Sequence, residues 1–196
     1  MKLLHIDSSI LGEASASREL SAAIVQAVNR AMPGAEIIRR DLDADPIPHL
    51  DSGLLAATLK GSAVLDEFLG ADIVVIGTPM YNFTIPSQLK AWLDRIVIVG
   101  KTVRYTEAGA QGLMGDKKVI IASSRGGLYA PGMPQQANDF QETYLRAILG
   151  FIGIEDIDVI RAEGIALGPE QRDAAMRAAL ASVSSAVAGL VPAKAA

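Results

Sequence analysis

Five short blocks of aliphatic and β-branched residues recur along the chain, and each block predicts a β-strand. The blocks cover residues 2–6, 35–40, 72–77, 117–123 and 156–164. The third and fourth blocks are almost continuously apolar, a pattern typical of parallel strands. We therefore expect these two strands to be buried on both faces of a sheet.

Segments with helical spacing alternate with the five blocks. The clearest one places Leu20, Ile24, Val28 and several alanines on one side of a helix. Further helices are predicted over residues 62–70, 86–97, 138–151 and 169–190. Pro86 and Pro169 suit the first turn of their helices, because the amide hydrogen that proline lacks has no partner there.

This alternation predicts an α/β fold with a five-stranded parallel sheet, since parallel strands need crossovers and right-handed crossovers place helices on both faces. Alternation alone does not distinguish strand order 2-1-3-4-5 from 3-2-1-4-5. Five strands favour the first, which is the flavodoxin-like, three-layer α/β/α arrangement. No repeat, linker or low-complexity tract interrupts the chain, so we expect one domain over residues 1–196. Ligands bind such sheets beyond the carboxyl ends of the strands, which directs attention to the loops after the first, third and fourth strands.

The loop after the first strand, DSSILGEASASREL, surrounds the start of a helix with serines. Hydroxyls and free amides at a helix N-terminus can bind a phosphate without any basic residue. The simpler alternative is that Ser15 or Ser17 caps the helix and the other serines are turn residues. The loop contains neither a dinucleotide-binding glycine motif nor a P-loop, which argues against both of those classes.

The loop after the third strand, TPMYNFTIPSQLKAW, sets Met80, Tyr81 and Phe83 around Asn82. Flat apolar surface beside an amide that both donates and accepts suits a planar heteroaromatic ring. The same aromatic residues could instead plug the core beneath the helix that starts near Pro86.

The loop after the fourth strand begins SRGGLY. Gly126 and Gly127 permit positive φ and a close approach of a ligand to the backbone, and a tight turn is the alternative. Because the three loops are expected to converge, together they indicate a phosphate near the first strand and a ring between the third and fourth.

Charge and composition exclude several other functions. The net charge is −4 and basic residues are scattered, which argues against a nucleic-acid partner. The chain has no cysteine and only two distant histidines, His5 and His49, so we expect no metal site and no thiol chemistry. MKLLHID reaches an aspartate too early for a secretory leader, and no apolar run approaches the roughly 20 residues of a membrane span. We expect a cytoplasmic protein without a membrane partner.

The order of these segments resembles that of the FMN-dependent NADH-azoreductases, a flavodoxin-like family of NAD(P)H:quinone oxidoreductases. The resemblance runs over essentially the whole chain and is carried by DLDADPIPHLD, PMYNFTIPSQLKAWLDR, VRYTEAGAQGL, SSRGG and FIGIEDIDVIRAEG. It implies bound FMN, NADH or NADPH as electron donor, and two-electron reduction of quinones by a ping-pong mechanism. Two such cycles would supply the four electrons that azo cleavage requires.

The resemblance also implies which residues bind FMN. The phosphate contacts would be Ser9, Ser15, Ala16 and Ser17. The ring contacts would be Met80, Tyr81, Asn82 and Phe83 on one part of the isoalloxazine, and Ser124, Arg125, Gly126 and Gly127 on another. Because the chemistry belongs to the flavin, no catalytic side chain is assigned, and Tyr105, Tyr129 and Arg125 are only candidates for a proton donor. Arg125 could equally be a surface residue or the structural partner of a carboxylate.

In this family a homodimer builds each active site from both subunits, which implies a substrate pocket of Phe83, Tyr105, Tyr129 and Phe151. Simple core burial is the alternative for Phe151. Two departures from the family pattern affect the expected substrate range. Residues 50–65 look shorter than in many members, and Tyr129 stands where some members carry a histidine.

Two other classes remain as alternatives. A non-catalytic flavodoxin-type electron carrier would be a monomer with a strongly acidic docking face, whereas this chain is mildly acidic and has an additional aromatic loop over residues 103–113. A receiver-type regulatory module would need an acidic cluster after the first strand, where Asp7 stands alone beside serines.

Overall fold

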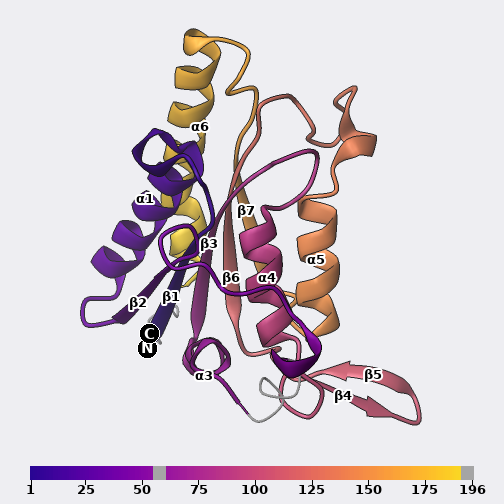
Figure 1. The fold of residues 1–196 in the computed structure, drawn as a ribbon. Coiled ribbons are helices and arrows are strands. Elements are labelled where there is room, and N and C mark those ends of the chain that lie inside the picture. The colour runs from indigo at the N-terminus through magenta and orange to yellow at the C-terminus, as the bar shows by residue number, and fades with distance from the viewer. Residues whose placement is uncertain (55–60, 191–196) are drawn as a thin grey trace.

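The computed structural model describes residues 1–54 and 61–190, and its central feature is a five-stranded sheet (Figure 1). The strands are β1 (Lys2–Asp7), β2 (Glu36–Asp41), β3 (Ile73–Pro79), β6 (Lys118–Ser124) and β7 (Ile157–Ala162). Their order is β2-β1-β3-β6-β7, and every neighbouring pair is parallel. Counted within this sheet the order is 2-1-3-4-5, so the predicted flavodoxin-like topology is confirmed.

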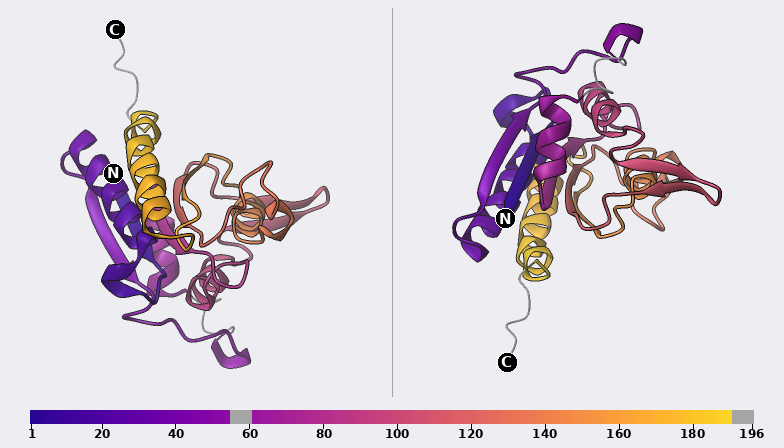
Figure 2. Two further views of the ribbon diagram at one scale, coloured as in Figure 1. Left: turned by 90° about the horizontal axis from the view of Figure 1, so that it is seen from above. Right: turned by 90° about the horizontal axis from the view of Figure 1, so that it is seen from below.

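Helices cover both faces of the sheet (Figure 2). One face packs against α1 (Ala16–Ala31) and α6 (Pro169–Ala188), and the other against α3 (Ala63–Gly70), α4 (Ser87–Ile96) and α5 (Glu142–Phe151). Successive side chains of a strand point to opposite faces, so one strand contributes to two cores. Leu3 of β1 belongs to the core under α1, and Leu4 to the core under α3 and α4.

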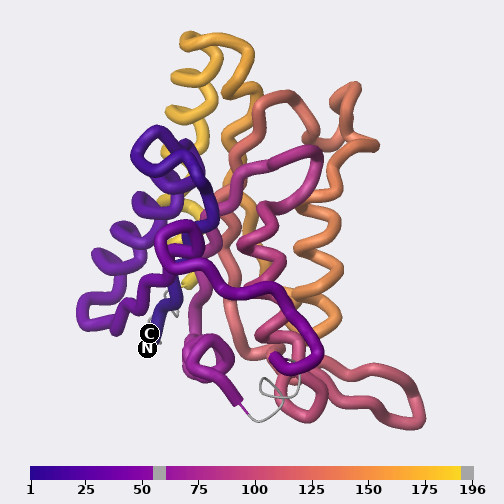
Figure 3. The backbone as a smooth tube through the Cα atoms, in the orientation of Figure 1, coloured from indigo at the N-terminus to yellow at the C-terminus, as the bar shows by residue number. Residues whose placement is uncertain are grey.

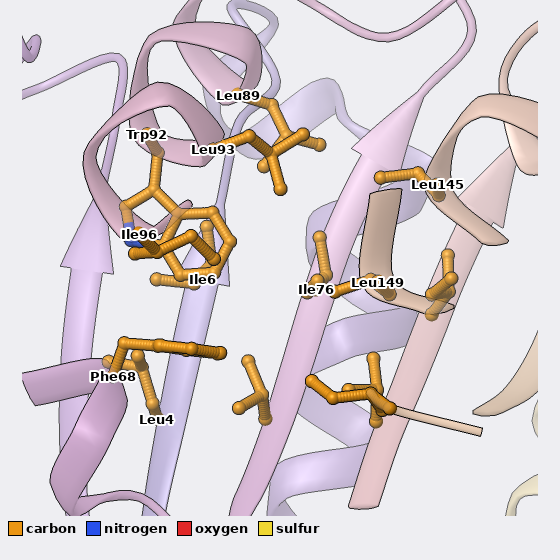
Figure 4. Packing of buried hydrophobic residues seen from close by; sticks show 14 of the residues in the cluster. Leu4, Ile6, Phe68, Ile76, Leu89, Trp92, Leu93, Ile96, Leu145 and Leu149 are labelled. Atoms are coloured by element: carbon orange, nitrogen blue, oxygen red, sulfur yellow. The ribbon is translucent and has the colours of Figure 1, made fainter. Parts of the chain in front are cut away.

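The core between the sheet and α4 is centred on Trp92, the single tryptophan of the chain (Figure 4). Trp92 is fully buried, and its ring meets that of Phe68 edge to face, with 5.8 Å between the centroids. Such a pair contributes about 0.5–1.5 kcal/mol beyond its buried area. Leu145 and Leu149 of α5 extend the same core over Ile76 of β3. This packing fixes the strand ends from which the loops emerge.

Helices α4 and α5 begin later than predicted. Helix α4 starts at Ser87, because Pro86 has extended backbone and only its carbonyl joins the helix, by accepting from the Lys90 amide. Helix α5 starts at Glu142 rather than at residue 138. Its start is set by the Asp139 carboxylate, which accepts the amide hydrogen of Glu142, while Gln136–Asn138 forms a separate 3-10 turn.

The segment predicted as an aromatic loop is an antiparallel hairpin of β4 (Val103–Thr106) and β5 (Gly109–Gly112). Its base packs backbone to backbone against the residues that follow α5: a Cβ on Gly112 would lie 2.0 Å from the Gly153 nitrogen. The hairpin therefore projects from the end of the molecule opposite the loops that follow β1, β3 and β6 (Figure 3). Within the described part of the chain, we find no helix with the length and hydropathy needed to cross a membrane.

Candidate functional site

The loops that follow β1, β3 and β6 meet at one end of the sheet (Figure 1). The Tyr81 hydroxyl lies 3.2 Å from Ser9 Oγ, which joins the first loop to the second. The Met80 amide donates to the Ser124 carbonyl at 2.8 Å, and the rings of Phe83 and Tyr129 meet edge to face at 6.3 Å, which joins the second loop to the third. The predicted convergence of the three loops is thus present in the structure.

The serine loop forms a buried set of donors at the start of α1. Ser15 is the N-cap, with its Oγ accepting from the Arg18 amide at 3.3 Å and lying 3.1 Å from Ser17 Oγ. Ser9, Ser15 and Ser17 are all nearly inaccessible to solvent. The amides of Ala16 and Ser17 have no hydrogen-bond partner among the described residues. Ser15 therefore caps the helix while two amides remain free to donate hydrogen bonds to an anion.

Arg18, which sequence reasoning missed, holds this loop in place. Its guanidinium donates to the Ser9 carbonyl at 2.7 and 3.1 Å and to both carboxylate oxygens of Asp41 at 2.5 and 2.7 Å. These bonds from Arg18, with smaller contributions from the backbone amides of Asp43 and Ala44, lower the pKa of Asp41 to about 2. Arg18 is thus paired with Asp41. No sequence pattern points to this pair, because Arg18 lies on α1 and Asp41 ends β2, 23 residues further along the chain.

A second polar cluster lies below the loop between β1, β2 and α1. Ser21 Oγ donates to Asp7 at 2.8 Å, His5 Nε2 lies 3.0 Å from Ser21 Oγ and 3.3 Å from Asp7, and Arg39 donates to Asp7 at 2.9 Å. Burial alone would raise the pKa of Asp7, but hydrogen bonds from His5, Arg39 and Ser21 together lower it. A serine hydrolase relay needs both nitrogens of the histidine, whereas here the serine and the carboxylate share Nε2. The cluster therefore does not form such a relay, and no group of three or more potential metal ligands occurs among the described residues.

The loop after β3 contains a strained turn. Tyr81 and Thr84 exchange two backbone hydrogen bonds of 2.9 and 3.0 Å, and the two residues between them, Asn82 and Phe83, have φ values of 48° and 71°. Positive φ at both central positions defines a type I′ turn, which is costly for a residue such as phenylalanine. Phe83 is 45% exposed, so it is not a plug of the core. Strain of this kind is characteristic of functional sites.

The two glycines of SRGGLY do not have positive φ, so that reason for their presence is wrong. A Cβ on Gly126 would lie 3.3 Å from that of Ala166, and a Cβ on Gly127 would lie 3.1 Å from the Tyr129 ring. The glycines therefore make room for the protein's own side chains. Their amides have no partner among the described residues and stay available to a ligand.

Arg125 is the structural partner of carboxylates and not a surface residue. Its side chain is wholly buried and contacts Asp139, Glu142 and Glu163. Its own amide and carbonyl are also bonded, to Ala162 and Ile165. From this position the guanidinium cannot reach a ligand, which removes Arg125 as a candidate proton donor.

Tyr105 and Phe151 lie away from the three loops. Tyr105 is on the β4–β5 hairpin and Phe151 ends α5, so both are at the opposite end of the sheet from Phe83 and Tyr129 (Figure 1). They are 66% and 37% exposed, so core burial is the wrong interpretation of Phe151. Within one chain the structure does not assemble the predicted four-residue pocket. The prediction that residues 50–65 affect the substrate range concerns, in part, residues 55–60, which lie outside the described residues.

Known proteins resemble this chain over almost its whole length. A family profile described as flavodoxin-like fold matches residues 1–187. The chain is 55% identical over 189 residues to FMN-dependent NADH:quinone oxidoreductase 1 from Xanthomonas axonopodis pv. citri, with 94% of this chain and 96% of that protein covered. It is 53% identical over 194 residues to FMN-dependent NADH:quinone oxidoreductase from Methylocella silvestris, with coverages of 91% and 95%.

Solved structures agree. The FMN-dependent NADH-azoreductase from Bacillus anthracis, determined in complex with FMN, matches with a TM-score of 0.87 at 26% identity and covers 97% of this chain and 99% of its own. Whole-length identity above one half, together with this fold and loop geometry, shows that the chain belongs to the flavodoxin-like fold family and, within it, to the oxidoreductases named FMN-dependent NADH:quinone oxidoreductases and azoreductases.

Proposed function

We propose that this chain is a cytoplasmic, FMN-binding oxidoreductase that transfers two electrons from NADH or NADPH to quinones by a ping-pong mechanism and cleaves aromatic azo compounds in two cycles. The observation that carries the proposal is the union of the three loops, with free amides at residues 16 and 17 on one side and 126 and 127 on the other. The names of the relatives support FMN, NADH and quinones, and the name of the azoreductase from Bacillus anthracis supports azo substrates. NADPH goes beyond those names.

The donor set of this end of the sheet fits FMN. A phosphate would meet the hydroxyls of Ser9, Ser15 and Ser17 and the free amides of Ala16 and Ser17, at the positive end of the α1 dipole. The planar ring would lie between two segments, Met80, Tyr81, Asn82 and Phe83 on one side and Ser124, Arg125, Gly126 and Gly127 on the other. Arg125 is in this set only because it stands between Ser124 and Gly126. Its side chain is buried inside the protein and does not reach the ring.

Bound FMN would supply the redox chemistry, which is hydride acceptance and two-electron transfer. The chain's part is to orient the ring and to stabilise negative charge that develops on it. The amides of Gly126 and Gly127 are fixed donors for that charge, and the Asn82 amide can donate or accept at the ring edge. Phe83 and Tyr129 would exclude water from the ring. Protons can come from solvent, so no general acid is assigned.

We further propose that residues 1–196 act as one domain and that the enzyme is a homodimer in which each site takes Tyr105 and Phe151 from the second copy. The support is their exposure at the end of the sheet opposite the three loops. Large exposed aromatic side chains on a projecting hairpin and a helix end are suited to an interface.

The direct test begins with the visible spectrum of the purified protein, followed by titration with FMN. Oxidation of NADH and of NADPH is then followed with a benzoquinone and with an azo dye, and light scattering gives the mass in solution. Parallel double-reciprocal lines are expected for the ping-pong mechanism. Failure to bind FMN would sink the proposal, and FMN binding by a monomer without quinone turnover would favour the electron carrier.

A further inference from the structure

The loops after β3, β6 and β7 share one buried anchor, the guanidinium of Arg125. Its Nε donates to Ser123 Oγ and to Gln141 Oε1, both at 3.1 Å. Its Nη1 bonds Glu163 at 3.1 Å, and its Nη2 bonds Asp139 at 3.0 Å and also contacts Glu142. All three nitrogens are thus engaged inside the protein. A planar guanidinium can hold several acceptors in fixed directions, which an ammonium group cannot do.

Three of the partners of Arg125 each hold a different part of the candidate site. Glu163 accepts the Tyr129 amide at 2.9 Å, which fixes the residue whose ring meets Phe83. Gln141 donates to the carbonyl of Thr78 at 3.0 Å, close to the point where β3 leaves the sheet.

Asp139 completes the set on the side of the strained turn. It begins α5 by accepting the Glu142 amide, and its neighbour Phe140 donates to the Phe83 carbonyl at 3.0 Å. Thr84 of the same turn donates its hydroxyl to the Phe140 carbonyl at 3.3 Å. The residues on both sides of the proposed ring are therefore connected to one side chain that does not itself reach the ring.

We propose that Arg125 is a positioning residue: it sets the separation between the Asn82–Phe83 turn and the Gly126–Tyr129 segment, and through it the affinity and environment of the bound ring. The inference rests on the proposed function, because the ligand it concerns is FMN. By this inference Arg125 acts through Asp139, Gln141 and Glu163 and does not itself contact the ligand.

Arg161 provides a matched control. It belongs to the same ionic cluster and donates to Glu142 at 2.7 and 2.8 Å, but it is partly exposed and bonds none of Asp139, Gln141 and Glu163. Arg161→Gln therefore removes one positive charge from the cluster and leaves the anchor intact. Arg125→Lys keeps the positive charge but loses the planar guanidinium that holds several acceptors in fixed directions. Glu163→Ala frees the Tyr129 amide while Arg125 keeps two carboxylates, so this variant is expected to fold even where Arg125→Lys does not.

The experiment measures the FMN dissociation constant by flavin fluorescence, the visible absorption band of the bound flavin, and amide exchange of the protein without FMN. Arg125→Lys and Glu163→Ala are expected to raise the dissociation constant at least tenfold, to shift the flavin band, and to speed exchange at Tyr129 at least tenfold without changing exchange in β1 and β3. Arg161→Gln is expected to change the dissociation constant less than twofold and to leave the band in place.

Wild-type affinity and band position in Glu163→Ala, or equal losses in Glu163→Ala and Arg161→Gln, would overturn the positioning role. Absence of FMN binding by the wild-type protein would instead overturn the proposed function. Exchange at Tyr129 that stays slow in Glu163→Ala would overturn the anchor itself, whatever the outcome with FMN.

Discussion

The hydroxyl of Tyr81 lies 3.2 Å from Ser9 Oγ and 3.3 Å from the Ile10 amide, so one phenol connects the ends of two neighbouring strands. On one side of this contact are the free amides of α1, and on the other is the strained Asn82–Phe83 turn. In the proposed function the same contact joins the phosphate and ring halves of the site.

Tyr81→Phe is expected to raise the FMN dissociation constant about fivefold, because a net hydrogen bond contributes roughly 1 kcal/mol. Isothermal titration with FMN measures the change. Tyr144→Phe is the control, since it makes the same chemical change on α5, at a hydroxyl that bonds neither Ser9 nor Ile10. Equal effects of the two substitutions would mean that the Ser9–Tyr81 contact does not shape the site.

Phe83→Gly is expected to be more stable than Phe83→Ala by about 1 kcal/mol, although it has the smaller side chain. Both variants lose the contact with Tyr129, but only glycine adopts a φ of 71° without steric cost. Urea unfolding in the absence of FMN measures the difference and is independent of the proposed function. Alanine at least as stable as glycine would show that the turn is not strained as the backbone angles indicate.

Asp41→Asn is expected to lower the free energy of unfolding at neutral pH by about 1.5 kcal/mol, because Arg18 loses a charged partner. The folded-state pKa of Asp41, about 2, lies below its ordinary value of 3.8. Its stabilising contribution is therefore complete above pH 4 and disappears as the pH falls towards 2. Urea unfolding of the wild type and of Asp41→Asn tests this: the difference between their free energies of unfolding should be smaller at pH 3 than at pH 7.

The control for that prediction is Asp43→Asn, whose carboxylate is 39% exposed and lies 3.9 Å from Arg18. It should change stability little at either pH. A difference between wild type and Asp41→Asn that grows at pH 3 would contradict the pairing of Arg18 with Asp41.

Gly112→Ala and Gly150→Ala should shift stability in opposite directions. A Cβ at residue 112 would overlap the Gly153 backbone, so we expect a loss of about 3 kcal/mol or displacement of the hairpin. Gly150 lies in α5 with open space around it, and alanine there should add about 0.5–1 kcal/mol. Thermal unfolding of both variants tests the pair, and a harmless Gly112→Ala would show that the hairpin is not anchored on Gly153.

The periodicity of the sequence predicted the five strands of the main sheet, because buried parallel strands are apolar and their crossovers are helical. It left two strand orders open, and the number of strands favoured the observed one. It did not predict the β4–β5 hairpin. Its residues Arg104, Tyr105 and Thr106 are exposed, so no buried face imposes the alternation by which a strand is recognised. The start of α5 was misplaced for a related reason, since it depends on the carboxylate of Asp139 and not on apolar spacing.

The sequence by itself determined that the loops after β1, β3 and β6 meet, because strand direction and order place those strand ends at one edge of the sheet. Only the tertiary structure decided the role of individual side chains in those loops. It shows that Arg125 is buried inside the protein and that the Tyr129 ring occupies the space a side chain at Gly127 would need. It also shows that Tyr105 and Phe151 lie far from the three loops of their own chain. Such roles depend on contacts between residues distant in sequence, and hydrophobic patterning constrains which face a residue occupies but not which partner it meets there.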